Sequence, residues 1–427
     1  MSAVPIPSNW RVRVRMYCHG LGDCFLLTFA GGGHVLIDCG VLNPDFSRLR
    51  AAVEDILKET GGKVDVLVIT HEHWDHISGF TQARGLMDQL EFSNIWVAWT
   101  EKVPGDAEAE ALRARYDKVK DTLRLVADYP GNPVADETRE LLAFFGLSSE
   151  ALAFSDATRE AMGYILSRLK ALANNGHYCE PGETLEPLGS GVRFHVLGPP
   201  HGSRLLKKKD PVPGARETYE LALASATIDD PESRNTWDYP FETGFKMEPL
   251  NLPARSRLGK VLALYNDPAA SWRRIDTDWL AGSASLALQM DGYTNNTSLA
   301  LAIELGGGEV LLFPGDAQVG NWQSWHEVKW RTPGVDTRSL LSNVVLYKAG
   351  HHASHNGTLR ARGLELMTGL RHVMIPTDEQ FALTRNPKGR WQMPAKPLYA
   401  ALAAQSKNSI DRSDAAPPGA LYIDWYM

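Results

Sequence analysis

The sequence feature that most constrains the fold is the apolar run at residues 64–69, which leads directly into the polar heptad Thr70-His71-Glu72-His73-Trp74-Asp75-His76. An apolar run of this length, rich in β-branched residues, is typical of a buried strand. The polar residues then follow the carboxyl end of that strand. The sequence therefore predicts a sheet that carries a cluster of polar side chains at one edge.

The heptad places three histidines and an aspartate within six residues. Buried polar groups need partners, and a metal ion is the simplest partner for so many imidazole and carboxylate groups. The helical motif HExxH is excluded, because position 75 is an aspartate. His71 and His73 lie two residues apart and can face the same way, whereas Asp75 and His76 turn toward a second position. The spacing predicts two metal ions, and the opposing interpretation is a polar surface loop.

The pattern His71-x-His73-x-Asp75-His76-x-x-Gly79 after a strand resembles the signature of the metallo-β-lactamase-fold hydrolases. The resemblance implies an α/β (α+β) fold, a four-layer αββα sandwich with a dinuclear metal site on one edge. The segments Gly20-Leu21-Gly22-Asp23 and Ile37-Asp38-Cys39-Gly40 resemble, within that family, the subgroup related to the hydrolase domain of bacterial DNA-uptake competence proteins. In this subgroup Asp38 would support the metal-binding histidines, and a strand-end cap is the alternative role.

Later segments resemble the remaining metal-binding positions of the family. Asp316, which follows the apolar run 310–313, matches the aspartate that bridges both ions. The adjacent His351 and His352 follow the apolar run 344–348; His351 is favoured as the ligand with His352 beside the substrate, and the reverse order is open. The third ligand of the first ion is assigned to His201, which follows the predicted strand 192–197, and His195 and His177 are the alternatives.

The resemblance therefore implies a set of metal ligands and a set of catalytic residues. The expected ligands are His71, His73, Asp75, His76, His201, Asp316 and His351, and the expected catalytic residues are Asp75, His352 and Lys348. Lys348 would neutralise an anionic substrate, and a solvated strand-end lysine is the alternative. Nitrogen and oxygen ligands suit two Zn²⁺ ions, with Mn²⁺ as the alternative. Water between the ions would lose a proton near neutral pH and attack the substrate.

The rest of the chain indicates a single domain over residues 1–427. Alternating or continuous apolar runs predict strands at 11–16, 24–29, 35–38, 94–99, 192–197, 299–303 and 419–426, and helical spacing predicts helices at 45–58 and 397–404. Helical spacing at 107–126, 137–145 and 158–173 predicts an inserted helical segment at about 101–176. A short helix signal at 217–226 and a Pro- and Asp-rich stretch at 229–249 predict a second insertion at about 202–285.

Composition and charge limit which binding partners and which cellular compartment are expected for the protein. A formal charge of −7 argues against a broad basic surface for long nucleic acid, and the run Lys207-Lys208-Lys209 is interpreted as a solvated loop. The four cysteines lack CxxC spacing and are expected to be buried thiols. No leader segment opens the chain and no apolar run reaches membrane-spanning length, so a cytoplasmic protein without a membrane partner is expected.

The resemblance to the DNA-uptake subgroup favours hydrolysis of phosphodiester bonds in DNA, RNA or a small nucleotide. The expected partner is thus an anionic small molecule or a nucleic-acid substrate, and the helical insertion offers a surface for a protein partner. Hydrolysis of a carboxylic ester, lactone or thioester is the second interpretation. The third is a non-catalytic protein in which the metal site is structural. The sequence does not determine the oligomeric state.

Overall fold

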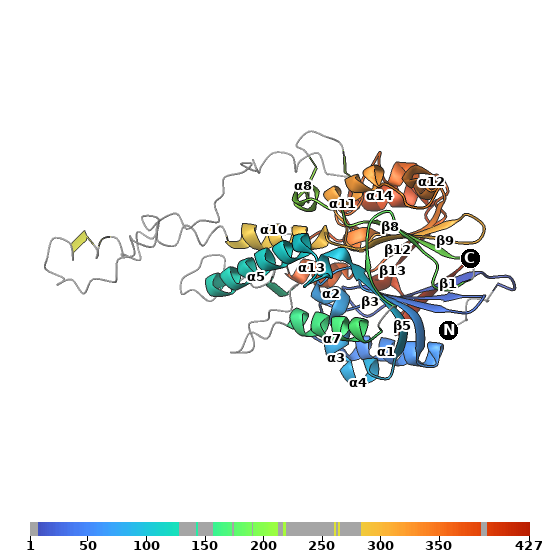
Figure 1. Cartoon of the computed structure of the whole chain (residues 1–427), viewed down its shortest axis with the longest axis horizontal. Coiled ribbons are helices and arrows are strands. Elements are labelled where there is room, and N and C mark those ends of the chain that lie inside the picture. The colour runs from blue at the N-terminus through green and yellow to red at the C-terminus, as the bar shows by residue number, and fades with distance from the viewer. Residues whose placement is uncertain are drawn as a thin grey trace.

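The computed structural model describes residues 7–127, 142–143, 157–172, 175–189, 191–211, 217–218, 260–261, 264, 283–385 and 391–427. Two sheets of seven strands each pack face to face, and helices cover the outer face of each sheet (Figure 1). This arrangement is the αββα sandwich that the sequence predicts. The expected fold class is therefore confirmed.

The first sheet has the strand order β14-β1-β2-β3-β4-β5-β6. Its antiparallel half contains β14 (Tyr422–Tyr426), β1 (Val12–Tyr17), β2 (Cys24–Phe29) and β3 (His34–Cys39). Its parallel half continues from β3 with β4 (Lys63–Val68), β5 (Glu91–Ala98) and β6 (Gly176–Cys179). The helix α1 (Ser47–Thr60) joins the parallel strands β3 and β4, as the apolar spacing predicts.

The second sheet has the order β13-β12-β11-β10-β9-β8-β7. Its parallel half contains β13 (Ile410–Arg412), β12 (His372–Ile375), β11 (Val344–Lys348) and β10 (Val310–Phe313). Its antiparallel half contains β9 (Ala300–Glu304), β8 (Arg193–Gly198) and β7 (Thr184–Leu185). The chain's last strand, β14, pairs with β1 and thus returns to the first sheet, as predicted.

The core lies in three layers because strand side chains alternate between the two faces of each sheet. On β4, Val66 and Val68 pack between the sheets, whereas Leu67 faces the outer helices. The outer layer of the first sheet includes α3 (Gly79–Gln82), α4 (Arg84–Met87) and α7 (Ala157–Ala171). That of the second includes α11 (Val319–Ser324), α12 (Thr337–Ser342) and α14 (Lys396–Gln405).

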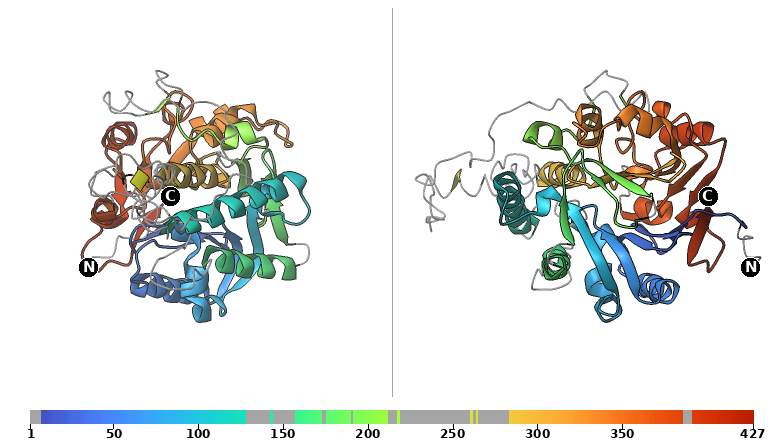
Figure 2. Two further views of the ribbon diagram at one scale, coloured as in Figure 1. Left: turned by 90° about the vertical axis from the view of Figure 1, so that its left-hand side faces the viewer. Right: turned by 45° about the vertical axis from the view of Figure 1, so that its right-hand side comes forward.

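The helix α5 (Ala107–Ala127), from the first predicted insertion, and α10 (Ser283–Asn295), which follows the second, lie side by side at one end of the sandwich (Figures 1 and 2). Met290 of α10 and Val119 of α5 share an apolar cluster with Trp74, from the histidine motif. The sequence predicts α5 but not α10, which contains a helix-weakening glycine, Gly292. Glycine suits this position because a Cβ would lie 2.8 Å from the Cβ of Lys209.

Several predicted elements lie outside the described residues. The predicted helices at 137–145 and 217–226 lie almost entirely outside them, and the stretch 229–249 lies fully outside them. Cys18, Cys24, Cys39 and Cys179 are buried free thiols, as expected. Within the described ranges, no helix is both long enough and apolar enough to cross a membrane.

Candidate metal centre

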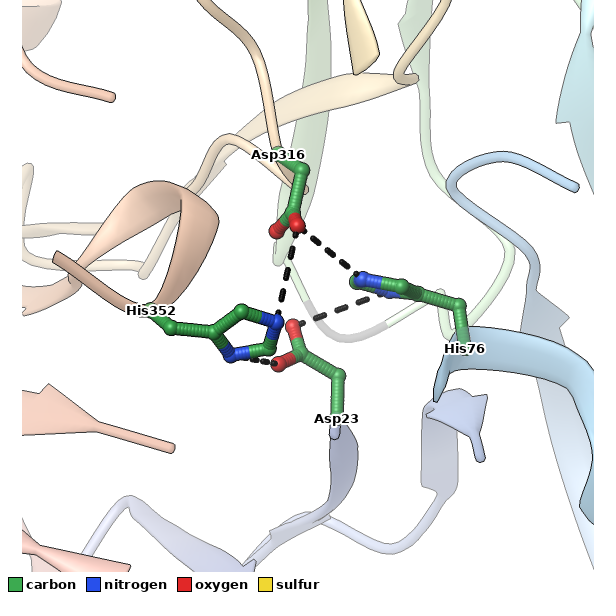
Figure 3. A group of neighbouring side chains, drawn as sticks. All are labelled: Asp23, His76, Asp316 and His352. Carbon is green, nitrogen blue, oxygen red and sulfur yellow. Dashed lines mark ion pairs between the residues drawn. The ribbon is translucent and has the colours of Figure 1, made fainter. Parts of the chain in front are cut away.

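The start of β2 and the carboxyl ends of β4, β10 and β11 bring a buried group of side chains together. The group consists of Asp23, His76, Asp316 and His352, and one nitrogen or oxygen atom of each lies within 4.8 Å of the others (Figure 3). Each of the four residues is at most 2% exposed. Figure 3 shows Asp316 and Asp23 approaching from opposite sides, with the two imidazoles between them.

The histidine motif divides as its spacing predicts. The backbone is extended at His73, and the short helix α2 (Trp74–Ile77) begins there. Nε2 of His71 lies 3.0 Å from Nδ1 of His73, so these two rings face each other. The side chain of His76, in α2, points toward Asp316 instead, and its Nε2 atom lies 3.3 Å from Oδ2 of Asp316. The motif thus offers two neighbouring sets of nitrogen and oxygen atoms.

His352 joins the set that contains Asp75 and His76. Its Nε2 atom lies 2.8 Å from Oδ2 of Asp75 and 3.7 Å from Oδ2 of Asp316. Asp316 therefore touches both histidines from β10, opposite the motif. Its own backbone amide donates to Oγ of Ser298 at 3.0 Å, which fixes the start of the loop after the strand.

Each of four histidines presents one ring nitrogen to this centre and the other to an outer group. The outer partner of His76 Nδ1 is Asp38 at 2.8 Å, and that of His352 Nδ1 is the Pro376 carbonyl at 2.7 Å. His71 Nδ1 lies 3.0 Å from Thr70 Oγ1, and His73 Nε2 lies 3.7 Å from Asp291 Oδ1. Outer partners of this kind orient metal-binding imidazoles and set their tautomers. The expected contact between Asp38 and a motif histidine is therefore present.

Lys348 is buried behind Asp316 rather than solvated at its strand end. Its ammonium lies 2.5 Å from Oδ2 of Asp23 and 3.2 Å from Oδ1 of Asp316, and it donates to the Gly315 carbonyl at 3.0 Å. The alternative of a solvated lysine is therefore wrong. Lys348 compensates the charge of two carboxylates, and its expected part in catalysis stays a prediction.

Electrostatics separates the four histidines into two pairs. Burial and the neighbouring imidazoles lower the pKa of His71 well below its usual value, and burial lowers that of His73 to about 4. Burial also opposes the charged form of His76, but the carboxylates around it, Asp316 foremost, outweigh burial and raise its pKa well above the usual value. The pKa of His352 is raised in the same way. Burial thus favours the neutral form of His71 and His73, whereas the surrounding carboxylates favour the protonated form of His76 and His352.

Asp75 and Asp316 stay ionised in spite of their burial. Burial would raise the pKa of Asp316, but His76 and Lys348 hold it well below its usual value. The pKa of Asp75 is lowered by His76 and His352, which also outweigh burial. The centre thus concentrates negative charge in a place that water does not reach.

The residues fit a divalent metal. Three buried atoms of the group make no hydrogen bond among the described residues: Asp23 Oδ1, Asp75 Oδ1 and His76 Nε2. Buried polar atoms without partners are costly, and a cation held by imidazole nitrogen and carboxylate oxygen would satisfy them. His76, His352 and Asp316 would hold such an ion, with Asp23 and Asp75 beside them.

The order of the adjacent histidines is the reverse of the favoured one. The structure brings His352, not His351, to Asp75 and His76. The His351 ring is held elsewhere: its Nδ1 lies 2.5 Å from Ser354 Oγ, and its Nε2 lies 3.4 Å from Asn295 Nδ2. Only its backbone amide contacts Asp316, at 3.1 Å. The cause is local backbone geometry, since residues 351–353 all have left-handed φ angles of 50° to 60°.

None of the three candidates for the third ligand of the first ion is brought to the centre. His201 is 46% exposed, stacks on Trp99 and contacts Glu180 at 2.7 Å and Glu108 at 3.1 Å. The alternatives are likewise engaged with glutamates outside the centre, His195 with Glu304 and His177 with Glu183, each at 2.8 Å. The structure thus places His201 against Trp99, Glu108 and Glu180 and does not bring it to the centre.

Two residues of the centre were missed from the sequence. Asp23 belongs to the Gly-x-Gly-Asp turn, and this turn is the sequence signal that could have identified it. Gly22 of the turn packs against the backbone of Gly40 and Asp75, where there is no room for a Cβ. Asp291 lies in α10 and in no motif, and burial raises its pKa to about 7. No sequence signal announces Asp291, since only the packing of α10 brings it to His73.

A comparison with protein families matches residues 19–87 to the metallo-beta-lactamase superfamily. The match contains Asp23, Asp38 and the histidine motif but ends before Asp316 and His352, which the tertiary structure adds. No curated protein matches the chain. Together, the family match and the buried group of potential ligands indicate a metal-dependent hydrolase.

Proposed function

We propose that the protein is a hydrolase that holds two divalent metal ions, Zn²⁺ or Mn²⁺, and acts on phosphodiester bonds of a nucleic acid or nucleotide. His71 and His73 bind the first ion, and Asp75, His76 and His352 bind the second. Asp316 lies between the two positions as the shared carboxylate. The observation that carries this proposal is the paired arrangement of imidazoles, each with one nitrogen directed inward and the other toward an outer partner.

When bound, the ions would supply the activation of water and the polarisation of the substrate. The protein's own residues hold the geometry. Asp38 and the Pro376 carbonyl fix the rings of His76 and His352, at 2.8 Å and 2.7 Å. Lys348 keeps Asp316 ionised and in place through its contact of 3.2 Å. The site excludes bulk water, since its histidines and carboxylates are at most 2% exposed apart from Asp291.

An anionic substrate is supported by positive charge beside α10. The basic run interpreted as a solvated loop packs against this helix, with Lys209 next to Gly292. Lys207 and Arg115 line one small cavity together with Tyr293 of α10. Asp291 of the same helix lies with its Oδ1 atom 3.7 Å from Nε2 of His73. Cations in this position would attract a phosphate-containing substrate despite the net negative charge of the chain.

Hydrolysis of a carboxylic ester, lactone or thioester is the second candidate. It is favoured by the apolar cluster around Trp74, which includes Leu21, Leu42, Met290 and Met393. Trp74 lies within the motif, between His73 and Asp75. An apolar surface this close to the metal positions would suit an acyl chain better than a phosphate.

The test measures bound metal and hydrolysis together. Wild type and the variant Asp316→Ala would be assayed for metal content and for cleavage of bis(p-nitrophenyl) phosphate, labelled single-stranded DNA and p-nitrophenyl esters. The matched control is Glu365→Ala, which removes an exposed carboxylate paired with Arg360. We expect two ions per wild-type chain and phosphodiester cleavage that is lost in Asp316→Ala and kept in the control.

Other outcomes separate the alternatives. Two ions with ester cleavage and no phosphodiester cleavage would replace the proposed substrate class by the acyl class. No bound metal after reconstitution would overturn the assignment as a metal-dependent hydrolase.

A further inference from the structure

A buried cluster of four charges joins the inserted helix α5 to the histidine motif. It consists of Glu72, Glu101, Arg113 and Lys120, and we name it the α5 clamp. Arg113 contacts Glu72 at 2.5 Å and Glu101 at 2.6 Å, and Lys120 contacts Glu72 at 3.3 Å. The side chains of Glu72 and Lys120 are 3% and 2% exposed. Two basic residues of one helix thus converge on a single carboxylate of the motif.

The position of Glu72 links the clamp to the proposed metal site. Glu72 lies between His71 and His73, whose rings face each other at 3.0 Å. Glu72 contacts Arg113 and Lys120 of α5, whereas His71 and His73 contact each other. The Glu72 carboxylate accordingly points into α5 while the two imidazoles face the centre. Any force that holds this carboxylate therefore also holds the backbone that carries both histidines.

The geometry of α5 suits such a role. Arg113 and Lys120 are seven residues apart, which is about two helical turns, so they lie on the same face of the helix. Burial would raise the pKa of Glu72, but these two cations lower it to about 2 and keep it ionised. The helix begins at Ala107, after the end of the matched family segment at residue 87. The clamp thus joins the matched histidine motif to a helix that lies beyond the matched segment.

Stability alone does not account for the clamp. Removing charges from water costs several kcal/mol per ion, and well-packed apolar side chains in the same place are often equally stabilising. Buried charges do, however, define one geometry, because each of them needs a specific partner. An apolar contact between α5 and the motif would allow sliding that the clamp prevents.

We propose that the α5 clamp is a positioning device for the first metal-binding pair: by holding Glu72, Arg113 and Lys120 fix the separation and direction of His71 and His73. The inserted helix is then part of the metal centre and not a detachable cover. This inference rests on the proposed metal-binding function. It concerns affinity for the ion held by His71 and His73, and leaves the ion held by Asp75, His76 and His352 unaffected.

The test is a Zn²⁺ titration in competition with a chromophoric chelator, with Glu72→Ala, Glu72→Gln and the double variant Glu72→Leu/Lys120→Met. The double variant also removes the ammonium that Glu72→Ala would leave buried, and so protects the fold. The control is Asp117→Ala, which removes a partially exposed α5 carboxylate paired with Arg159. Circular dichroism and thermal unfolding of the metal-free proteins report on folding separately.

For one of the two ions, we expect about 10–100-fold weaker binding in Glu72→Ala and in the double variant. Glu72→Gln, which keeps the hydrogen-bonding shape, should recover part of this loss, and Asp117→Ala should bind as wild type. A folded double variant that binds both ions with wild-type affinity would overturn the inference and leave the proposed function intact. A wild type that binds no zinc would overturn both.

Discussion

Oδ2 of Asp38 lies 2.8 Å from Nδ1 of His76, and the same carboxylate accepts hydrogen bonds from the backbone amide and the hydroxyl of Thr70 at 2.8 Å and 2.7 Å. Asp38 is fully buried and has a left-handed φ of 54°. It therefore connects the end of β3 to both ends of the histidine motif. This contact directs the other nitrogen of His76 toward Asp75 and Asp316.

Asp38→Asn should weaken metal binding and hydrolysis by about 10–100-fold, because the amide no longer provides the charged acceptor that orients the His76 ring. Zinc affinity by chelator competition and kcat for the best substrate would measure the effect. Asp65→Asn is the matched control: this aspartate also accepts a backbone hydrogen bond, from His34 at 2.7 Å, but lies on β4 outside the centre. Equal affinities for the two variants would contradict a supporting role for Asp38.

The two adjacent histidines should behave differently when each is replaced. His352→Ala removes a nitrogen that faces Asp75 at 2.8 Å, so we expect more than about 100-fold weaker binding of one ion. His351→Ala removes a ring held by Ser354 and Asn295, and less than about tenfold loss is expected. Metal content after dialysis against a weak chelator distinguishes the two. Loss of an ion in His351→Ala alone would restore the order favoured from the sequence.

Lys348→Met should destabilise the metal-free protein by about 3–5 kcal/mol, because it leaves Asp23 and Asp316 buried without their shared cation. Urea unfolding at neutral pH measures this loss as a lower midpoint with an unchanged slope. Lys396→Met, at an exposed position at the start of α14, is the control and should change the stability by less than about 0.5 kcal/mol. A midpoint for Lys348→Met equal to that of the control would contradict the role assigned to Lys348.

Metal affinity should rise with pH. The surrounding carboxylates outweigh burial and raise the pKa of His76 and of His352, which favours the protonated form of both rings in the metal-free protein. A metal ion competes with protons for these rings, and the competition is strongest on the acidic side. Calorimetry in buffers of different protonation enthalpy should find that metal binding releases protons, and that His352→Gln releases fewer. Binding without proton release would show that the two rings are neutral before the metal arrives.

Local pattern was sufficient for most of the fold. The strands β1 to β5 and β8 to β11 have continuous or alternating apolar patterns, which are typical of strands that pack on a core. The short strands β7, with two residues, and β13, with three, offer too few positions for a period to show. They form because β8 and β12 present open edges to them.

The residues of the candidate site also divide into those that local spacing predicts and those that only the structure places. The heptad determines His71, His73, Asp75 and His76 because their roles depend on spacing within one loop. His351 and His352 are neighbours in one short segment, so no periodicity separates them, and the left-handed backbone decides which ring reaches Asp75. His201 was assigned by its place after a strand, but the glutamates at Glu108 and Glu180 hold it outside the centre.

The sequence by itself, with its family resemblance, predicted the sandwich architecture, the motif, Asp316 as its counterpart in the family pattern, and the buried state of the four cysteines. Only the tertiary structure decided the place of Asp23, Asp291, Lys348 and the α5 clamp. The physical reason is distance along the chain: apolar periodicity and ligand spacing are local properties. The contacts of Lys348 with Asp23 and of Arg113 with Glu72 join segments 325 and 41 residues apart, and exist only once helices and sheets have packed.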